Sequence, residues 1–290
     1  MGVQKCSFDS MGTSWNVSVW GDIAETTFLA LEQTIRAYCT IFDHTYSRFI
    51  PDSLICELSQ QTGTHRVPTD FVDILKIYMK FFTLSQGAFT PLVGDTLSDL
   101  GYDAEYSLKP KSHIRSVPDF LEVVTIVDDC HISLKDTVTI DIGALGKGFA
   151  VDAIADILDQ KGVMNYLVDG SGDIRYKGET AIKVGLEHPH DAKKVVGVAD
   201  FTTGAMCSSA TNRRTWEGMH HIINPFKASS NTEIEATWVI TDTAVYADGL
   251  ATALFLCPPE QFEKDIAFEY VLLNKELKIK RSPGFNVSLC

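Results

Sequence analysis

The sequence predicts an α+β protein in which helices pack on largely antiparallel sheets. Segments with apolar residues at helical spacing and short runs of β-branched or alternating residues both occur, and the second half is richer in short strands and turns. No internal repeat of short period and no linker rich in Pro, Gly or Ser divides the 290 residues. We therefore expect one domain over residues 1–290, or two closely packed subdomains within it.

The chain is expected to begin with a strand and a helix. Residues 12–20 alternate between apolar and polar side chains, which is typical of a strand, and residues 24–38 carry apolar side chains at helical spacing. A second helix is expected after Pro51, with Asp52 or Ser53 as its N-cap, because these side chains accept hydrogen bonds from the first turn.

The rest of the chain mixes helices and short strands. Residues 71–85 predict a third helix, which should end at Gln86 and Gly87 because glycine commonly follows a helix C-terminus. Further strands are expected at 122–127, 137–142, 165–169, 181–186, 195–201 and 234–241, and further helices at 148–160, 244–256 and 259–267.

Composition and charge exclude several classes of protein. With 45% hydrophobic and 22% charged residues, the chain is typical of a globular protein. The net charge is −13 and the basic residues are scattered, so no nucleic-acid partner is expected. No apolar run reaches about 18 residues, so no transmembrane segment is expected. The N-terminus lacks the pattern of a signal peptide, which favours a cytoplasmic location; removal of a leader would instead favour export or membrane anchoring.

The seven cysteines are dispersed, with no C-x-x-C pair and no regular spacing. This pattern argues against a disulfide framework and against a zinc site. Most of them are expected to be small buried hydrophobic residues.

The segment 138–150 is the most informative part of the chain. A β-branched run leads into Gly143, Gly146 and Gly148, with Lys147 among them, and an amphipathic helix follows. Such loops expose backbone N–H groups at a helix N-terminus and bind anions. A P-loop is excluded because glycine follows Lys147, and the glycine spacings do not fit the dinucleotide fingerprint. Two interpretations stay open, a phosphate-binding loop and a helix start that needs glycine for packing.

A metal site is indicated by Asp248 and Thr252. They are four residues apart in a predicted helix, so their oxygen atoms lie on one face. A carboxylate with a hydroxyl suits magnesium, and a divalent cation would help an acidic protein to bind an anionic substrate. The alternative is a capping aspartate with a threonine that faces the core.

Paired histidines and two aromatic segments are further candidates. His220 and His221 lie on a predicted strand that stops at Asn224, and alternation places the two rings on opposite faces. One imidazole could act as a general base near neutral pH; the alternative is a structural histidine. Residues 87–91 and Phe49 could offer backbone groups and stacking surfaces, or could simply be core residues.

Seven segments in chain order resemble the motifs of the ApbE family, the FAD:protein FMN transferases. The family patterns include D-L-G-G-I-A-K-G-Y-A and A-D-A-L-A-T-A. The matching segments are Met11–Thr13, Ser47–Ser53, Gly87–Pro91, Asp141–Ala150, Asp169–Ile174, His221–Pro225 and Ala247–Ala253, and the similarity extends to Phe285. The resemblance implies an ApbE-like (T-fold-like) arrangement of antiparallel sheets with packed helices.

The resemblance also implies an activity. A magnesium-dependent enzyme would split the pyrophosphate of FAD, transfer FMN to a threonine or serine hydroxyl of an acceptor protein, and release AMP. The alternatives are an FAD pyrophosphatase, in which water replaces the acceptor, and a flavin-binding protein without catalytic activity.

The roles that the resemblance implies fall on named residues. Asp248 and Thr252 would bind Mg²⁺ together with the backbone carbonyl of Ala144, and His221 would be the base that activates the acceptor hydroxyl. Contacts with FAD are implied for Met11, Phe49, Ala88, Phe89, Thr90, Asp141, Lys147 and Ile223.

Several positions depart from the family patterns. Thr90 and Asn224 each replace an aspartate, Asp169 and Ser171 alter the N-x-G-G-D pattern, and Ala210 stands where the family often has glycine. None of these changes removes a predicted metal ligand. We therefore expect activity to be retained with an altered preference for the donor.

Overall fold

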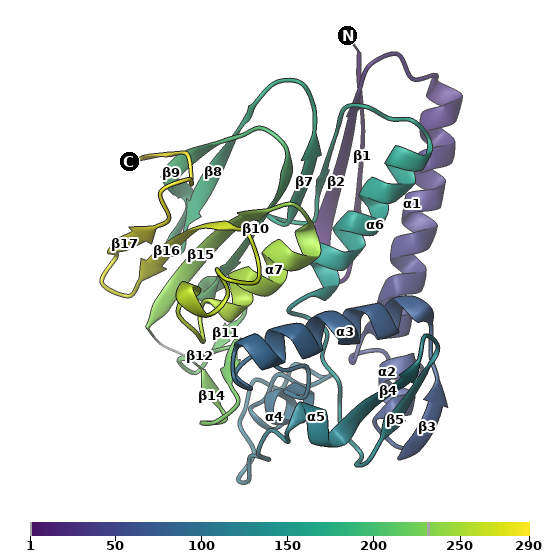
Figure 1. The fold of residues 1–290 in the computed structure, drawn as a ribbon, viewed down its shortest axis with the longest axis vertical. Coiled ribbons are helices and arrows are strands. Elements are labelled where there is room, and N and C mark those ends of the chain that lie inside the picture. The colour runs from purple at the N-terminus through teal and green to yellow at the C-terminus, as the bar shows by residue number, and fades with distance from the viewer. Residues whose placement is uncertain (1, 231–232) are drawn as a thin grey trace.

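A central antiparallel sheet of eight strands organises the structure, a computed structural model that describes residues 2–230 and 233–290 (Figure 1). The order of the strands across the sheet confirms the predicted α+β class with antiparallel pairing. In spatial order the strands are β1 (Val3–Ser10), β2 (Thr13–Trp20), β6 (Tyr166–Asp169), β7 (Ile174–Lys177), β10 (Gly204–Ala210), β15 (Ile234–Thr241), β16 (Glu269–Asn274) and β17 (Ile279–Arg281).

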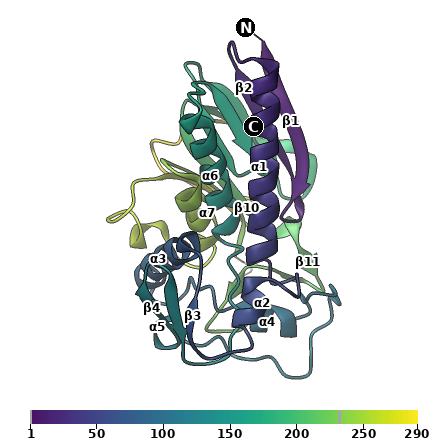
Figure 2. The same cartoon turned by 90° about the vertical axis from the view of Figure 1, so that its right-hand side faces the viewer.

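Three helices cover one face of this sheet: α1 (Glu25–Tyr46), α6 (Gly146–Gln160) and α7 (Ala244–Ala253) (Figure 2). The buried side chains of α1 recur every three or four residues, so a single face of the helix meets the core. They are Phe28, Leu31, Ile35, Cys39, Phe42 and Tyr46. α6 and α7 also contact each other, and this contact positions the site described below.

The opposite face of the sheet is covered by a smaller antiparallel sheet. Its strands, in spatial order, are β18 (Val287–Leu289), β9 (Asp191–Phe201) and β8 (Ile182–His188). Phe201 and Phe285 are buried against Trp238 of β15, in a second hydrophobic cluster. The middle strands β10, β15 and β16 are therefore buried on both faces, which accounts for their apolar and aromatic side chains.

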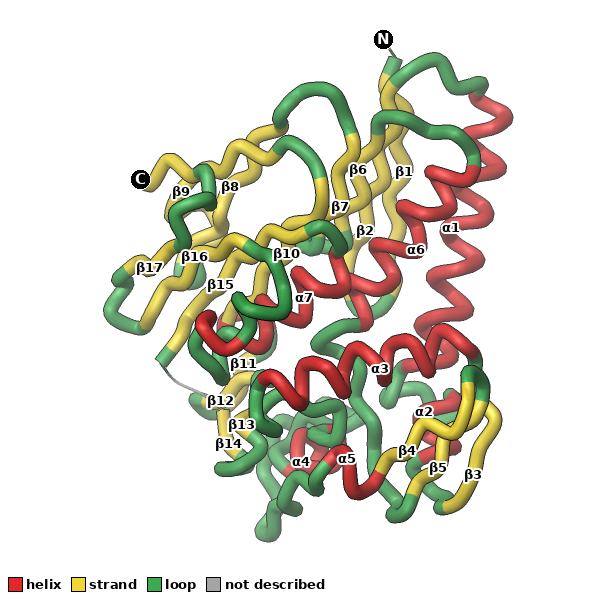
Figure 3. The backbone as a smooth tube through the Cα atoms, in the orientation of Figure 1, coloured by secondary structure: helices red, strands yellow, loops and turns green. Residues whose placement is uncertain are grey.

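A second region, rich in loops, lies beside the end of the helical layer (Figure 3). α3 links it to the main body, because Phe81 lies 5.9 Å, centroid to centroid, from Tyr246 of α7. The region contains α2 (Leu54–Leu58), α3 (Thr69–Leu84), α4 (Gly94–Asp99), α5 (Phe120–Val123) and the antiparallel sheet β3 (Gly63–Arg66), β5 (His131–Leu134), β4 (Val124–Asp128). One hydrophobic cluster runs through both regions.

Two short hairpins and two 3₁₀ helices complete the fold. The hairpins follow β10 and lead back to β15, so they border the same edge of the helical layer. They are β11 (Thr215–Trp216) with β12 (Met219–His220), and β13 (Ile223–Asn224) with β14 (Ser229–Ser230); the 3₁₀ helices are Thr211–Arg213 and Pro259–Gln261. No helix in the described residues is long and apolar enough to cross a bilayer.

Most of the expected elements are confirmed, and three are wrong; one of these, the strand expected through His220 and His221, is described with the site below. Residues 137–142 are extended and apolar but form no strand in the described structure. Instead, Asp141 N donates to Pro91 O at 2.7 Å and Thr139 N to Asp95 Oδ2 at 3.1 Å, so loop contacts satisfy this backbone. The helix expected at 259–267 is only the 3₁₀ turn at its start, followed by further turns.

Smaller differences concern the ends of elements. α1 continues beyond its expected end at Tyr38 to Tyr46, because Phe42 and Tyr46 extend its buried face. Ser53 is the N-cap of α2, as expected, and its side chain accepts from Cys56 N. Several elements were not predicted from the sequence, among them β1, β3, β5, β7, β10, β16, β17, β18, α4 and α5. All seven cysteines are free, and four of them (Cys6, Cys39, Cys207 and Cys257) are buried, as expected.

Candidate functional site

Two adjoining cavities, of about 240 and 260 Å³, lie where α6, α7, the segment after α3 and the short hairpins meet. Every residue predicted for the site lines one of the two. The first is lined by Ala88, Phe89, Thr90, Asp141, Ala144, Lys147, His221, Ile223, Asp248 and Thr252, and the second by Met11, Phe49, Asp141 and Lys147. The residues that line both are Gly12, Tyr102, Asp141, Gly143, Lys147 and Arg214.

Asp248 is a buried carboxylate with one oxygen free. Its side chain is on the buried face of α7, and Oδ2 accepts a hydrogen bond from Gly148 N at 2.9 Å. Within the described residues, no hydrogen bond to Oδ1 occurs. Burial raises the pKa of this carboxyl, and the charge of Lys147 opposes the rise. Thr252 lies one turn further along, with Oγ1 3.3 Å from Ser209 Oγ.

The carbonyl of Ala144 is also free, for a reason that lies in the first turn of α6. The N–H of Gly148 would ordinarily donate to the carbonyl four residues earlier, which belongs to Ala144. That N–H is donated to Asp248 instead. In the part of the chain that the structure describes, Ala144 O therefore accepts no hydrogen bond. A carboxylate oxygen, a carbonyl oxygen and a hydroxyl are hard donors, and this set fits a divalent cation such as Mg²⁺.

The backbone amides of the glycine loop have a different role from the one expected. Gly143 N donates to Asp141 Oδ1 at 2.7 Å, and Gly148 N donates to Asp248. Both amides are therefore committed to carboxylates. The interpretation of the loop as a cradle of free N–H groups for a phosphate is wrong for these two amides.

Gly148 also permits the close contact between α6 and α7. A Cβ atom at this position would lie 2.3 Å from Ala244 O and 2.7 Å from Asp248 Cβ. Asp152, one turn further along α6, accepts from the backbone N–H groups of Ala244 and Val245, each at 2.9 Å. These contacts fix the start of α7, and with it Asp248, against the glycine loop.

Gly148→Ala is therefore expected to force the two helices apart. Overpacking of this kind costs about 1–3 kcal/mol, so the variant should unfold at a lower temperature and should lose activity. Asp156→Ala, at an exposed position of the same helix, is the control for a general effect on α6. Thermal unfolding followed by circular dichroism measures both. An unchanged midpoint for Gly148→Ala would show that the helices tolerate the added methyl group.

Charged pairs line the junction of the two cavities. Arg48 is buried, and its Nε donates to Asp141 Oδ2 at 2.6 Å. Lys147 Nζ pairs with Asp173, whose side chain is fully buried and whose Oδ1 has no hydrogen-bond partner. Asp141 and Lys147 are thus held by partners that lie on other segments of the chain. Their positions depend on the tertiary fold rather than on the loop alone.

His221 is a buried neutral imidazole. β12 ends at His220, so the expected strand through both histidines is wrong, and His221 lies in the bend that follows. The residue keeps some contact with solvent, but its Nδ1 is enclosed and has no hydrogen-bond partner. Burial, aided by the charges of Arg214, His220 and Lys147, lowers its pKa to about 3. His220 is structural in character, because its Nδ1 accepts from Ile222 N at 3.2 Å.

Aromatic and left-handed residues shape the second cavity. The Phe49 ring stacks on the Tyr106 ring, with 5.4 Å between the ring centroids, and Arg48 Cζ lies 4.2 Å from the centroid of the Phe49 ring. Met11 has φ of 52° and donates its N–H to Asp43 Oδ2 at 3.1 Å. In the first cavity, the segment Ala88–Thr90 is buried.

The lining or supporting residues that were not singled out from the sequence include Arg48, Tyr102, Asp173 and Arg214. Arg48 and Asp173 lie inside segments that resemble family motifs. A charged residue in such a segment with no other assigned role could have been recognised from the sequence as a candidate site residue. Tyr102 and Arg214 carry no such signal, because only the tertiary fold brings them to the cavities.

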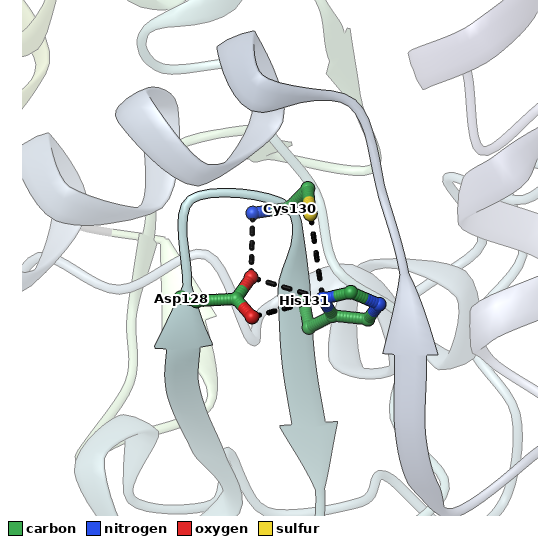
Figure 4. Close-up of side chains that lie close together, drawn as sticks. All are labelled: Asp128, Cys130 and His131. Atoms are coloured by element: carbon green, nitrogen blue, oxygen red, sulfur yellow. Dashed lines mark hydrogen bonds and ion pairs between the residues drawn. The ribbon is translucent and has the colours of Figure 1, made fainter.

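A separate cluster of potential metal ligands lies away from both cavities. Figure 4 shows Asp128, Cys130 and His131 in the turn between β4 and β5; in the described residues they are the one group of this kind with ligand atoms within 4.8 Å. His131 Nδ1 lies 2.9 and 3.0 Å from the Asp128 oxygens, and Cys130 N donates to Asp128 Oδ1 at 2.8 Å. These bonds account for the turn, and the cluster is not part of the predicted site.

Comparison with known proteins finds relatives that match most of the chain. The chain is 25% identical to the FAD:protein FMN transferase of Klebsiella pneumoniae (strain 342) over 279 residues, 88% of this chain and 79% of the relative. It is 24% identical to the enzyme of that name from Escherichia coli (strain K12) over 281 residues, 90% of this chain and 80% of the relative.

Two solved structures share the fold. The ApbE protein of Thermotoga maritima superposes with a TM-score of 0.84 at 21% identity, over 97% of each chain. The flavin transferase ApbE of Vibrio cholerae superposes with a TM-score of 0.80 at 22% identity, over 98% of each chain. The model of the ApbE family matches residues 11–270. The resemblance seen in the sequence is thus confirmed: the chain belongs to the ApbE family.

Proposed function

We propose that this protein is an FAD:protein FMN transferase, which moves FMN from FAD to a threonine or serine hydroxyl of an acceptor protein and releases AMP. The family function supports the overall reaction. One observation carries the assignment to this site. The free oxygen of buried Asp248 and the unbonded carbonyl of Ala144 line the same cavity as the neutral His221.

Asp248, Thr252 and the carbonyl of Ala144 would hold Mg²⁺. When bound, the ion would neutralise negative charge on the phosphoryl oxygens of the substrate. The buried carboxylate of Asp248 has no ion-pair partner of its own in the described structure, because Lys147 is paired with Asp173. A cation at this position would therefore compensate a charge that the protein leaves uncompensated.

His221 would accept the proton of the acceptor hydroxyl. A hydroxyl group is a weak nucleophile, so a neighbouring base increases its reactivity. The hydroxyl oxygen forms a bond to the phosphorus of the FMN phosphate, and the bond from that phosphorus to the oxygen of AMP breaks. The proton moves to the imidazole, which is neutral at physiological pH because burial lowers its pKa.

The two cavities suit the two halves of the donor. Phe49 and Tyr106 give the second cavity aromatic walls, which fit a planar isoalloxazine ring. The segment Ala88–Thr90 lines the first cavity, where adenosine would lie. Thr90 offers a neutral hydroxyl where the family pattern has an aspartate, so contacts with the adenosine half are the ones expected to differ.

Incubation with FAD, Mg²⁺ and a peptide that carries the acceptor motif of the family tests the proposal. Covalently flavinylated peptide and an equal amount of AMP are expected, and chelation of Mg²⁺ should stop both. Mass spectrometry of the peptide and chromatography of the nucleotides measure the products. AMP with free FMN would instead indicate a pyrophosphatase, and the absence of both products would indicate a flavin-binding protein.

A further inference from the structure

Arg214 lies at the junction of the two cavities and lines both of them. Lys147 is the other cationic residue that lines both. A ligand that extends from one cavity into the other must therefore pass these two side chains. FAD is such a ligand, since its pyrophosphate joins the flavin half to the adenosine half.

The charge of Arg214 is not neutralised by the protein. In the described residues it forms no ion pair, although the chain has a net charge of −13. The neighbouring Arg213 pairs with Glu187 at 3.2 Å, and Arg48 pairs with Asp141 at 2.6 Å. Lys147 is paired with Asp173. Among these basic residues, Arg214 alone lacks a carboxylate partner.

The guanidinium is held in place by an aromatic stack. Arg214 Cζ lies 5.6 Å from the centre of the Tyr102 ring, and Tyr102 stacks on Trp216 at 5.7 Å. Trp216 is itself fixed, because its Nε1 donates to Leu100 O at 2.8 Å. A cation over an aromatic face keeps its charge while losing mobility. Arg214 is therefore ordered without being neutralised, as a binding group for an anion should be.

We propose that Arg214 is a phosphate-binding residue of this site and contacts the pyrophosphate of the dinucleotide at the junction of the cavities. The inference rests on the proposed function, because it takes FAD as the ligand. A guanidinium can donate two parallel hydrogen bonds to phosphoryl oxygens, which a lysine cannot. The position also explains why Arg214 contributes to the low pKa of His221, since the two side chains line the same cavity.

Comparison of Arg214→Gln with Arg36→Gln tests this assignment. The second variant removes the same charge from a residue that lines neither cavity and pairs with Glu32 at 2.6 Å. Binding of FAD and of riboflavin, which has no phosphate, is measured by isothermal titration calorimetry. Loss of a charged hydrogen-bond partner should weaken FAD binding by about 10- to 100-fold in Arg214→Gln. Riboflavin binding should be unchanged, and Arg36→Gln should bind both as the unmodified protein does.

Two further measurements separate a binding role from a structural one. Arg214→Lys keeps the charge and should recover part of the FAD affinity, and raised salt should weaken FAD binding less in Arg214→Gln than in the unmodified protein. Equal loss of riboflavin and FAD binding, or equal effects of Arg36→Gln and Arg214→Gln, would overturn the assignment. If FAD binds as expected but no FMN is transferred, the proposed function fails while the role of Arg214 stands.

Discussion

Asp248→Asn is expected to abolish Mg²⁺-dependent FMN transfer while leaving the fold intact. The amide keeps the shape and can still accept from Gly148 N, but it removes the charge that would hold the cation. Loss of a metal that supplies several kcal/mol of transition-state stabilisation corresponds to about a 10³-fold lower kcat/KM or more. Steady-state release of AMP from FAD over a range of Mg²⁺ concentrations measures the effect.

The stability of the same variant gives a second test. Burial raises the pKa of Asp248 above the ordinary value of 3.8, so the folded state binds the proton more tightly than the unfolded chain. The contribution of Asp248 to the stability of the metal-free protein is therefore fully present below pH 3.8 and is lost as the pH rises through the raised value. At neutral pH, metal-free Asp248→Asn should unfold at a higher temperature than the unmodified protein. Asp242→Asn, at an exposed position just before α7, is the control, and undiminished transfer by Asp248→Asn would refute the metal assignment.

His221→Asn should slow transfer by about 10²- to 10⁴-fold, the usual contribution of a general base. FAD affinity should be retained, because the role assigned to His221 is proton acceptance rather than donor binding. Transfer under saturating FAD and acceptor peptide measures kcat, and calorimetry measures the affinity for FAD. His190→Ala, at an exposed position, controls for the loss of any histidine. Loss of FAD binding would make His221 a ligand contact instead.

The pH dependence provides a further check on His221. With a pKa of about 3, the imidazole stays neutral across the neutral range, so its ionisation should not appear in the rate profile there. The unfolded chain binds this proton more readily than the folded protein does. The contribution of neutral His221 to the free energy of unfolding is therefore fully present above about pH 6.5 and is lost as the pH falls towards 3. His221→Asn should therefore unfold at a lower pH than the unmodified protein in an acid titration.

The spacing of Asp248 and Thr252 shows how far a sequence pattern can predict a site. Two oxygen-bearing side chains four residues apart in a helix must share a face, and both do line the first cavity. The free carbonyl of Ala144 could not be predicted in this way. It depends on the diversion of one N–H, that of Gly148, to a carboxylate that lies a hundred residues later in the chain.

The segment 137–142 shows why a local pattern can fail. Val138, Ile140 and Ile142 are apolar residues at every second position, a pattern typical of a strand, and all three are buried in the structure. The hydrogen bonds go to the Pro91 carbonyl and to the side chain of Asp95 in α4 rather than to a neighbouring strand, and no local signal reveals which partner a buried backbone will find. Arg214 is a comparable case, since its adjacency to Arg213 suggests a solvated basic pair, whereas only Arg213 has an acidic partner.

The close contact of α6 and α7 at Gly148 bears on the choice of ion. The oxygens of Ala144 and Asp248 come from two elements whose separation is fixed by a glycine with no room for a methyl group and by the bonds from Ala244 and Val245 to Asp152. Ca²⁺ requires ligand distances about 0.3–0.5 Å longer than Mg²⁺ and more ligands. Expansion of the site would have to break the interface between the two helices. If the proposed Mg²⁺ binds here, discrimination between cations by size would therefore be a property of the helix pair, and not of the ligand set alone.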